Sequence, residues 1–256
     1  MKHAIRRIDT PTRAHTHPFR SLGTALHAWW NRLVCGYAYI DDPGRHVAAA
    51  GISGWRLEAC QELPTVEPFP QSDLEPGAPN CALASIVRCL LYLKHRGPAP
   101  VTERAALYEQ VRRIGVRHGY APDKSGWFHD LFVYSPFCIA RMVTESAVAA
   151  AQPGICGRSR YVRRLATLRR ELDAGRPALL NIAFGDYPGH TVTIAGYRAY
   201  RGQHGAVRLY LRTIDGWRDA PSYIDWHRAR RVPSSVTCFS EMQEMYLKVA
   251  KTPEHP

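Results

Sequence analysis

Residues 190–216 read HTVTIAGYRAYRGQHGAVRLYLRTIDG. Apolar, β-branched and aromatic residues dominate both halves of this stretch, and a short glycine-containing loop at 201–204 separates the halves. This pattern predicts a β-hairpin made of the strands His190–Tyr200 and Ala206–Ile214. A third antiparallel strand is predicted for Ala178–Phe184, where the sequence is again mostly apolar.

The segments upstream of the hairpin have helical patterns. Residues 81–94 read CALASIVRCLLYLK and are nearly all apolar, with Asn80 at the N-cap position and Gly97-Pro98 beyond the end, which predicts a buried helix. Further helices are predicted for Leu22–Val34, Thr102–Arg117, Phe137–Ala151 and Arg160–Ala174. Because the helices precede the strands, the predicted fold class is α+β.

The chain of 256 residues divides by composition into two parts. Residues 61–80 contain five prolines and no helical period, so an extended loop is predicted there. Residues 1–60 are predicted to form an N-terminal extension or subdomain of unknown role. Residues 61–256 are predicted to form the main domain.

The net charge indicates what kind of partner the protein would bind, and the spacing of its cysteines indicates whether it would hold a metal. The chain has 34 Lys and Arg against 22 Asp and Glu, and a net charge of +12 favours an anionic partner. Six arginines lie within residues 158–170, a segment predicted to be one helix face on which such a partner would bind. The seven cysteines form no CxxC pair and have no metal-ligand spacing, so neither a metal nor another cofactor is predicted.

No membrane span is predicted. The most apolar early stretch, Ser21–Ile40, contains His27, Asn31 and Arg32, which are costly in a bilayer. The first twenty residues have four arginines and no apolar core, so no signal peptide is predicted. These features predict a cytoplasmic protein, or one exported without a classical signal peptide.

The hairpin brings two chemically reactive residues together. Pairing Tyr200 with Gly205 would place His190 opposite Asp215, and Cβ atoms of cross-strand neighbours lie about 4.5–5.5 Å apart. Cys81 begins a predicted helix, where the helix dipole and backbone N–H groups favour a thiolate. Taken singly, each residue has a structural explanation: a core cysteine, a strand histidine and a turn aspartate. Together they have the composition of a nucleophile, a base and an orienting acid.

With its flanking motifs, the sequence resembles the papain-like cysteine peptidases, especially the bacteriocin-leader (double-glycine) peptidase-like group. The stretches that carry the resemblance are Phe69-Pro70-Gln71, NCALAS at 80–85, LRRELDAGRPALL at 168–180, GHTVTIAGY at 189–197 and IDGW at 214–217. The chain departs from the family in having Ala82 after the cysteine, Gly216 after the aspartate, and a spacing of ten residues between Gln71 and Cys81.

The resemblance implies a papain-like fold with a cleft between a helical subdomain and a sheet subdomain. Cys81 would be the nucleophile, His190 the base and then the acid, and Asp215 would orient His190. Gln71 and the backbone N–H of Cys81 would bind the oxyanion, with Gln61 and Asn80 as alternative donors. The implied activity of the 61–256 domain is hydrolysis of a peptide bond in a protein or peptide substrate. Two alternatives stay open: a deamidase or acyl or peptidyl transferase, such as a bacterial effector or toxin, and a non-catalytic peptide- or anion-binding module.

Overall fold

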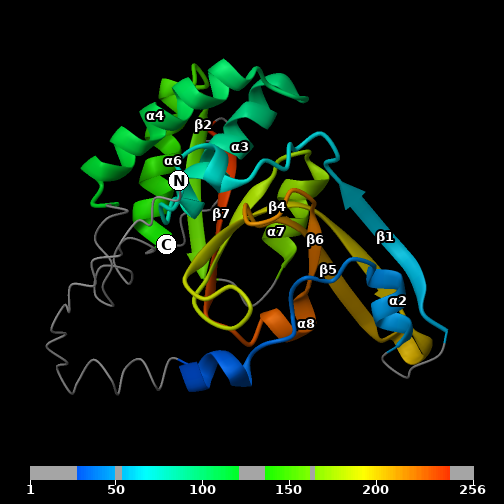
Figure 1. Cartoon of the computed structure of the whole chain (residues 1–256). Coiled ribbons are helices and arrows are strands. Elements are labelled where there is room, and N and C mark those ends of the chain that lie inside the picture. The colour runs from blue at the N-terminus through cyan, green and yellow to red at the C-terminus, as the bar shows by residue number, and fades with distance from the viewer. Residues whose placement is uncertain (1–27, 50–53, 121–135, 162–164, 243–256) are drawn as a thin grey trace, which may run out of the picture.

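The computed structural model describes residues 28–49, 54–120, 136–161 and 165–242 (Figure 1). The helices are α2 Pro43–Ala48, α3 Cys81–His95, α4 Val101–Arg117, α6 Pro136–Ala149, α7 Ala166–Asp173 and α8 Trp226–Ala229. The strands are β1 Arg56–Glu62, β2 Ile155–Tyr161, β3 Ala178–Ile182, β4 His190–Arg201, β5 Val207–Ile214, β6 Ser222–Asp225 and β7 Ser234–Glu241. Two 3₁₀ turns, η1 Gln71–Asp73 and η2 Gln203–Gly205, lie in loops. The predicted α+β class is confirmed.

The strands form one seven-stranded antiparallel sheet in the order β2-β7-β3-β4-β5-β6. β4 is 12 residues long, so β3 pairs with its first part and β1 with its second part, on the edge opposite β5. Gly196 stands between these two parts, with φ of 153°. A Cβ atom at this position would lie 2.5 Å from the carbonyl oxygen of Gln61, so the close approach of β1 requires glycine.

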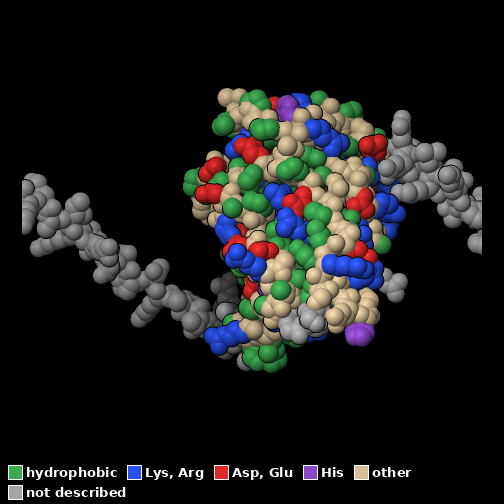
Figure 2. All heavy atoms as spheres, turned by 90° about the vertical axis from the view of Figure 1, so that its right-hand side faces the viewer, with side chains coloured by type: hydrophobic (Ala, Val, Ile, Leu, Met, Phe, Trp, Pro, Cys, Tyr) green, Lys and Arg blue, Asp and Glu red, His purple; other side chains and the backbone are tan. Residues whose placement is uncertain are grey.

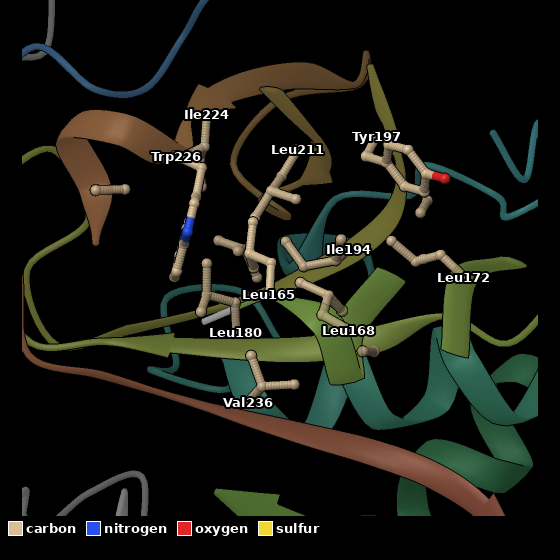
Figure 3. Close-up of a cluster of buried hydrophobic side chains, with 14 of the residues drawn as sticks. Leu165, Leu168, Leu172, Leu180, Ile194, Tyr197, Leu211, Ile224, Trp226 and Val236 are labelled. Atoms are coloured by element: carbon tan, nitrogen blue, oxygen red, sulfur yellow. The ribbon is translucent and has the colours of Figure 1, made fainter. Parts of the chain in front are cut away.

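Helices cover both faces of the sheet (Figure 1). α3, α4 and α6 cover one face, and α7 and α8 lie against the other. Adjacent residues of β3 point to opposite faces, since Leu179 packs under the first group of helices and Leu180 under the second. Figure 3 shows the second cluster, in which Leu168 and Leu172 of α7 face the sheet.

Most of the predicted elements form close to their predicted bounds. The helices predicted at 81–94, 102–117 and 137–151 are α3, α4 and α6, and the three predicted strands are β3, β4 and β5. Residues 28–33 are helical, whereas 22–27 of that predicted helix lie outside the described residues. The sequence patterns do not predict β1, β2, β6 or β7.

The helix predicted from Arg160 to Ala174 is wrong in its first part. Arg158 and Arg160 lie on β2, and the helix α7 begins only at Ala166. β2 pairs with β7 along its whole length, so a strand distant in sequence satisfies the backbone groups that a helix would satisfy locally. The arginines of 158–170 therefore do not form one helix face.

Opposite charges are mixed on the face of the molecule that carries β1 and α2. Figure 2 shows Lys and Arg side chains interspersed with Asp and Glu on this face. Arg198 pairs with Glu62 at 2.6 Å, and Arg201 pairs with Glu58. No helix in the described part of the chain combines the length and apolar character that crossing a bilayer demands.

The predicted boundary between residues 60 and 61 falls inside β1. The described residues before it also pack on the sheet: Ile40 forms a β-bridge with Tyr223, and Tyr37 belongs to the cluster under α7 and α8. This N-terminal segment therefore belongs to the same packed unit as the sheet.

The predicted register of the β4–β5 hairpin is wrong. Tyr200 pairs with Arg208 rather than Gly205, because the connection is a longer loop in which His204 and Gly205 both have positive φ. The ladder then shifts by one residue at a bulge between Ile194 and Gly196. Consequently His190 is not a ladder partner of Asp215.

Candidate active site

Cys81 is the first residue of α3 and is 4% exposed. Ser85 and Arg88 follow it at helical spacing on the same face. Ser85 Oγ donates to the carbonyl of Thr191 at 3.4 Å, and Arg88 Nη1 donates to Thr193 Oγ1 at 2.9 Å. Cys81, one turn before Ser85, lies on this same face of α3, which packs on the first residues of β4.

Asn80 occupies the N-cap position of α3, as predicted, but its side chain makes no capping hydrogen bond. Instead, Asn80 Nδ2 donates to the carbonyl of Gln71 at 3.2 Å and to the hydroxyl of Tyr108 at 3.0 Å. Asn80 is fully buried. Its side chain therefore ties the incoming loop to the first turn of α3.

Gln71 links that loop to the sheet. Its backbone N–H donates to the carbonyl of Gly216 at 2.8 Å. The chain then turns back through η1 and through Gly77, whose φ is 75°, before reaching Asn80. Gln71 Oε1 is buried and has no hydrogen-bond partner among the described residues. The Gln71 side chain lies against Gly216, where an added Cβ atom would stand 3.4 Å from Gln71 Oε1.

His190 meets Asp215, but through the main chain. His190 Nε2 donates to the backbone carbonyl oxygen of Asp215 at 2.7 Å, where sequence reasoning expected the carboxylate as acceptor. A carbonyl oxygen only accepts hydrogen bonds, so Nε2 carries the proton and Nδ1 of the neutral ring keeps its lone pair. The ring of Trp217 stacks on the imidazole, with centroids 3.9 Å apart.

The Asp215 carboxylate has other partners. Oδ1 accepts from the backbone N–H groups of Trp217 at 2.9 Å and Arg218 at 3.0 Å, which is the pattern of an Asx turn. Oδ2 accepts from the hydroxyl of Tyr187 at 3.2 Å. Asp215 is 2% exposed, so these three donors compensate its buried charge.

A buried positive charge lies beneath this turn. Arg88 is 1% exposed, its Nη2 donates to the carbonyl of Phe69 at 2.7 Å, and its guanidinium lies 4.6 Å from the Phe69 ring centroid. Burial lowers the pKa of Arg88 to about 10, and the charge of Asp215 partly opposes this shift. Arg88 therefore remains a cation at neutral pH.

Tyr187, Trp217 and Arg88 are neighbours of the candidate residues that the sequence does not predict. The heptad-like spacing of Arg88 from Cys81 was a usable signal, since it places both on one helix face. Tyr187 had no local signal, because its contacts depend on how two distant loops meet.

The described residues contain no group of three or more His, Cys, Asp or Glu side chains arranged to hold a metal ion. The arrangement offers a thiol at a helix start, an oriented imidazole and an amide side chain, which is the equipment for nucleophilic acyl chemistry. Comparisons with family models, curated proteins and solved structures find no match to this chain.

Proposed function

We propose that the protein is a papain-like thiol hydrolase that cleaves peptide bonds through a thioester on Cys81. The observation that supports this most directly is a continuous hydrogen-bonded path across the candidate site. It runs from Asn80 to Gln71, from Gln71 to Gly216, and from Asp215 to His190. The path joins the start of α3 to the start of β4, the two ends that a cysteine–histidine pair would occupy.

The proposed chemistry begins with proton transfer from the Cys81 thiol to Nδ1 of His190. The thiolate attacks the substrate carbonyl, and the oxyanion is bound by the backbone N–H of Cys81 and the side-chain amide of Gln71. His190 then returns its proton to the leaving amine, and the C–N bond breaks to give a thioester. Water, deprotonated by His190, hydrolyses the thioester and restores the thiol.

Selective alkylation tests the nucleophile. Brief treatment with a low dose of iodoacetamide at mildly acidic pH, followed by intact-mass analysis, should give a single adduct on Cys81, because a thiolate paired with imidazolium persists there. Cys81→Ala should abolish the adduct. Cys89→Ala, a matched change two turns along the same helix, should retain it. Equally slow reaction of all seven thiols would contradict the proposal.

Product analysis then tests the reaction. Incubation with a mixture of unstructured peptides should yield cleavage products with the wild-type protein and none with Cys81→Ala. Ammonia release from glutamine-containing peptides without cleavage would indicate a deamidase that uses the same thioester. An adduct on Cys81 without any turnover would leave the peptide-binding module as the function.

A further inference from the structure

Tyr187 lies in the loop between β3 and β4, and its completely buried side chain contacts both His190 and Asp215. Its hydroxyl donates to Asp215 Oδ2 at 3.2 Å. Its ring centroid lies 5.6 Å from that of His190 and 5.6 Å from that of Trp217. The Tyr187 side chain therefore contacts the turn formed by Asp215 and also packs beside the imidazole of His190.

The N-terminal segment holds this loop in place. The carboxylate of Asp186 accepts hydrogen bonds from three consecutive backbone N–H groups, those of Gly36, Tyr37 and Ala38, at 2.7–2.9 Å. The Tyr37 hydroxyl donates to the carbonyl of Phe184 at 2.7 Å and accepts from the backbone N–H of Tyr187 at 3.1 Å. The loop is thus tied to residues 36–38 at Phe184, at Asp186 and at Tyr187 itself.

We propose that Tyr187 is a positioning residue for His190, acting through the Asp215 turn. Its hydroxyl fixes the Asp215 carboxylate, which folds the turn so that the Asp215 carbonyl points at Nε2. The residues 36–38 contribute by fixing Tyr187, which gives the N-terminal segment a role in the site. The catalytic consequence rests on the proposed thiol chemistry, whereas the effect on the imidazole does not.

The chemistry of the tyrosine suits this role. Burial, and next the negative charge of Asp215, raise the pKa of Tyr187 further than the nearby hydroxyls of Ser222 and Thr213 lower it. The hydroxyl therefore stays protonated and remains a donor to the carboxylate. A phenylalanine would keep the ring against His190 and Trp217 and remove the hydrogen bonds of the hydroxyl, those with Ser222 and Thr213 as well as that to Asp215.

The test is Tyr187→Phe, with Tyr197→Phe as the matched control. Tyr197 is also buried, and its hydroxyl donates to the carboxylate of Asp173 at 2.7 Å. It lies on β4 seven residues beyond His190, away from the candidate site. Ring-¹⁵N-labelled histidine reports the tautomer of His190 by NMR, with His190→Gln identifying its signals. Turnover of a peptide substrate is measured in parallel.

The tautomer is read in a Cys81→Ala background, where no thiolate holds a second proton on His190. There we expect the chain with Tyr187 intact and its Tyr197→Phe variant to show one neutral tautomer, with the proton on Nε2, and Tyr187→Phe to show a mixture of tautomers. With Cys81 present, Tyr187→Phe should, at unchanged KM, lower kcat by about tenfold to a hundredfold, since a hydrogen bond to a charged group is lost. Asp186→Asn provides a second variant, with the same tautomer mixture expected. Unchanged His190 signals in both variants would overturn the proposal. A tautomer shift in a protein without turnover would uphold the positioning role and reject the thiol chemistry.

Discussion

Substitutions at Asp215 separate two roles that this residue could have. In the structure the carboxylate of Asp215 builds a turn, and its backbone carbonyl accepts a hydrogen bond from His190 Nε2. Asp215→Asn and Asp215→Ser keep a side-chain oxygen for the turn, whereas Asp215→Ala removes it. If the turn is what matters, the first two variants should resemble wild type more than the third.

The expected loss of stability follows from the three hydrogen bonds of the carboxylate. The N–H groups of Trp217 and Arg218 lie in a partly exposed turn, so losing their acceptor should cost about 1 kcal/mol each. The Tyr187 hydroxyl is buried, and leaving it without this acceptor should cost about 1–3 kcal/mol. Asp215→Ala is therefore expected to lower the free energy of unfolding by about 3–5 kcal/mol, and the other two variants by about 1–2 kcal/mol.

The expected loss of activity follows the turn. Without it the carbonyl no longer fixes the imidazole, and Asp215→Ala should lower kcat by about tenfold to a hundredfold. Asp215→Asn should lower kcat by less than about fivefold, because its side chain keeps the turn and can still form a hydrogen bond with the Tyr187 hydroxyl. Asp215→Ser keeps the turn but loses the Tyr187 bond, so it should lower kcat by about tenfold, at the lower end of the range expected for Tyr187→Phe. Asp225→Ala is the control for stability, since this buried carboxylate binds Arg208 and the start of α8 instead.

Urea unfolding and peptide turnover below the unfolding transition measure both effects. A role of the turn alone is refuted if Asp215→Asn folds with near wild-type stability but loses as much kcat as Asp215→Ala. That result would mean that the carboxylate acts directly on His190.

Three further outcomes are expected. Gln71→Ala should lower turnover by about 10²–10³ while iodoacetamide labelling of Cys81 persists, and activity lost instead in Gln61→Ala would reassign the oxyanion donor. Burial raises the pKa of Cys89 to about 12. Its thiolate fraction at pH 8 is then about 10⁻⁴, so it should be alkylated only in denaturant, with native labelling increasing as the pH approaches 12. Gly196→Ala should destabilise the fold by about 3 kcal/mol in urea unfolding, because the new methyl group would meet the backbone of β1.

The elements that the sequence predicts are those with local signals. The segment 81–94 is apolar with a capping position and a stop signal, and β4 and β5 are joined by a short loop, so neighbours in sequence define them. β2 and β7 pair across more than seventy residues. The helix predicted from Arg160 therefore includes residues 160 and 161, which belong to β2, whereas α7 begins only at Ala166. Such a pairing has no signature in either segment alone.

The sequence predicts which residues form the candidate site better than it predicts the contacts between them. Chemistry singles out Cys81, His190 and Asp215, and each lies at the start or end of a helix or strand, where it can reach another element. The acceptor for His190 was not predictable, because a backbone carbonyl has no residue identity. Tyr187 and residues 36–38 were missed for a similar reason, since their role comes from hydrogen bonds between loops 150 residues apart.

His190 and Asp215 meet despite the wrong register because both lie beyond the last β4–β5 pair, Thr193 and Ile214. Continued past that pair, the observed ladder places His190 opposite Trp217, whose ring does stack on the imidazole. The Asx turn then folds Asp215 back so that its carbonyl reaches the edge of the same ring. One turn therefore holds both the face and the edge of the imidazole. Since every residue has a carbonyl, position 215 requires a side chain that forms this turn, and a carboxylate is only one of several that can.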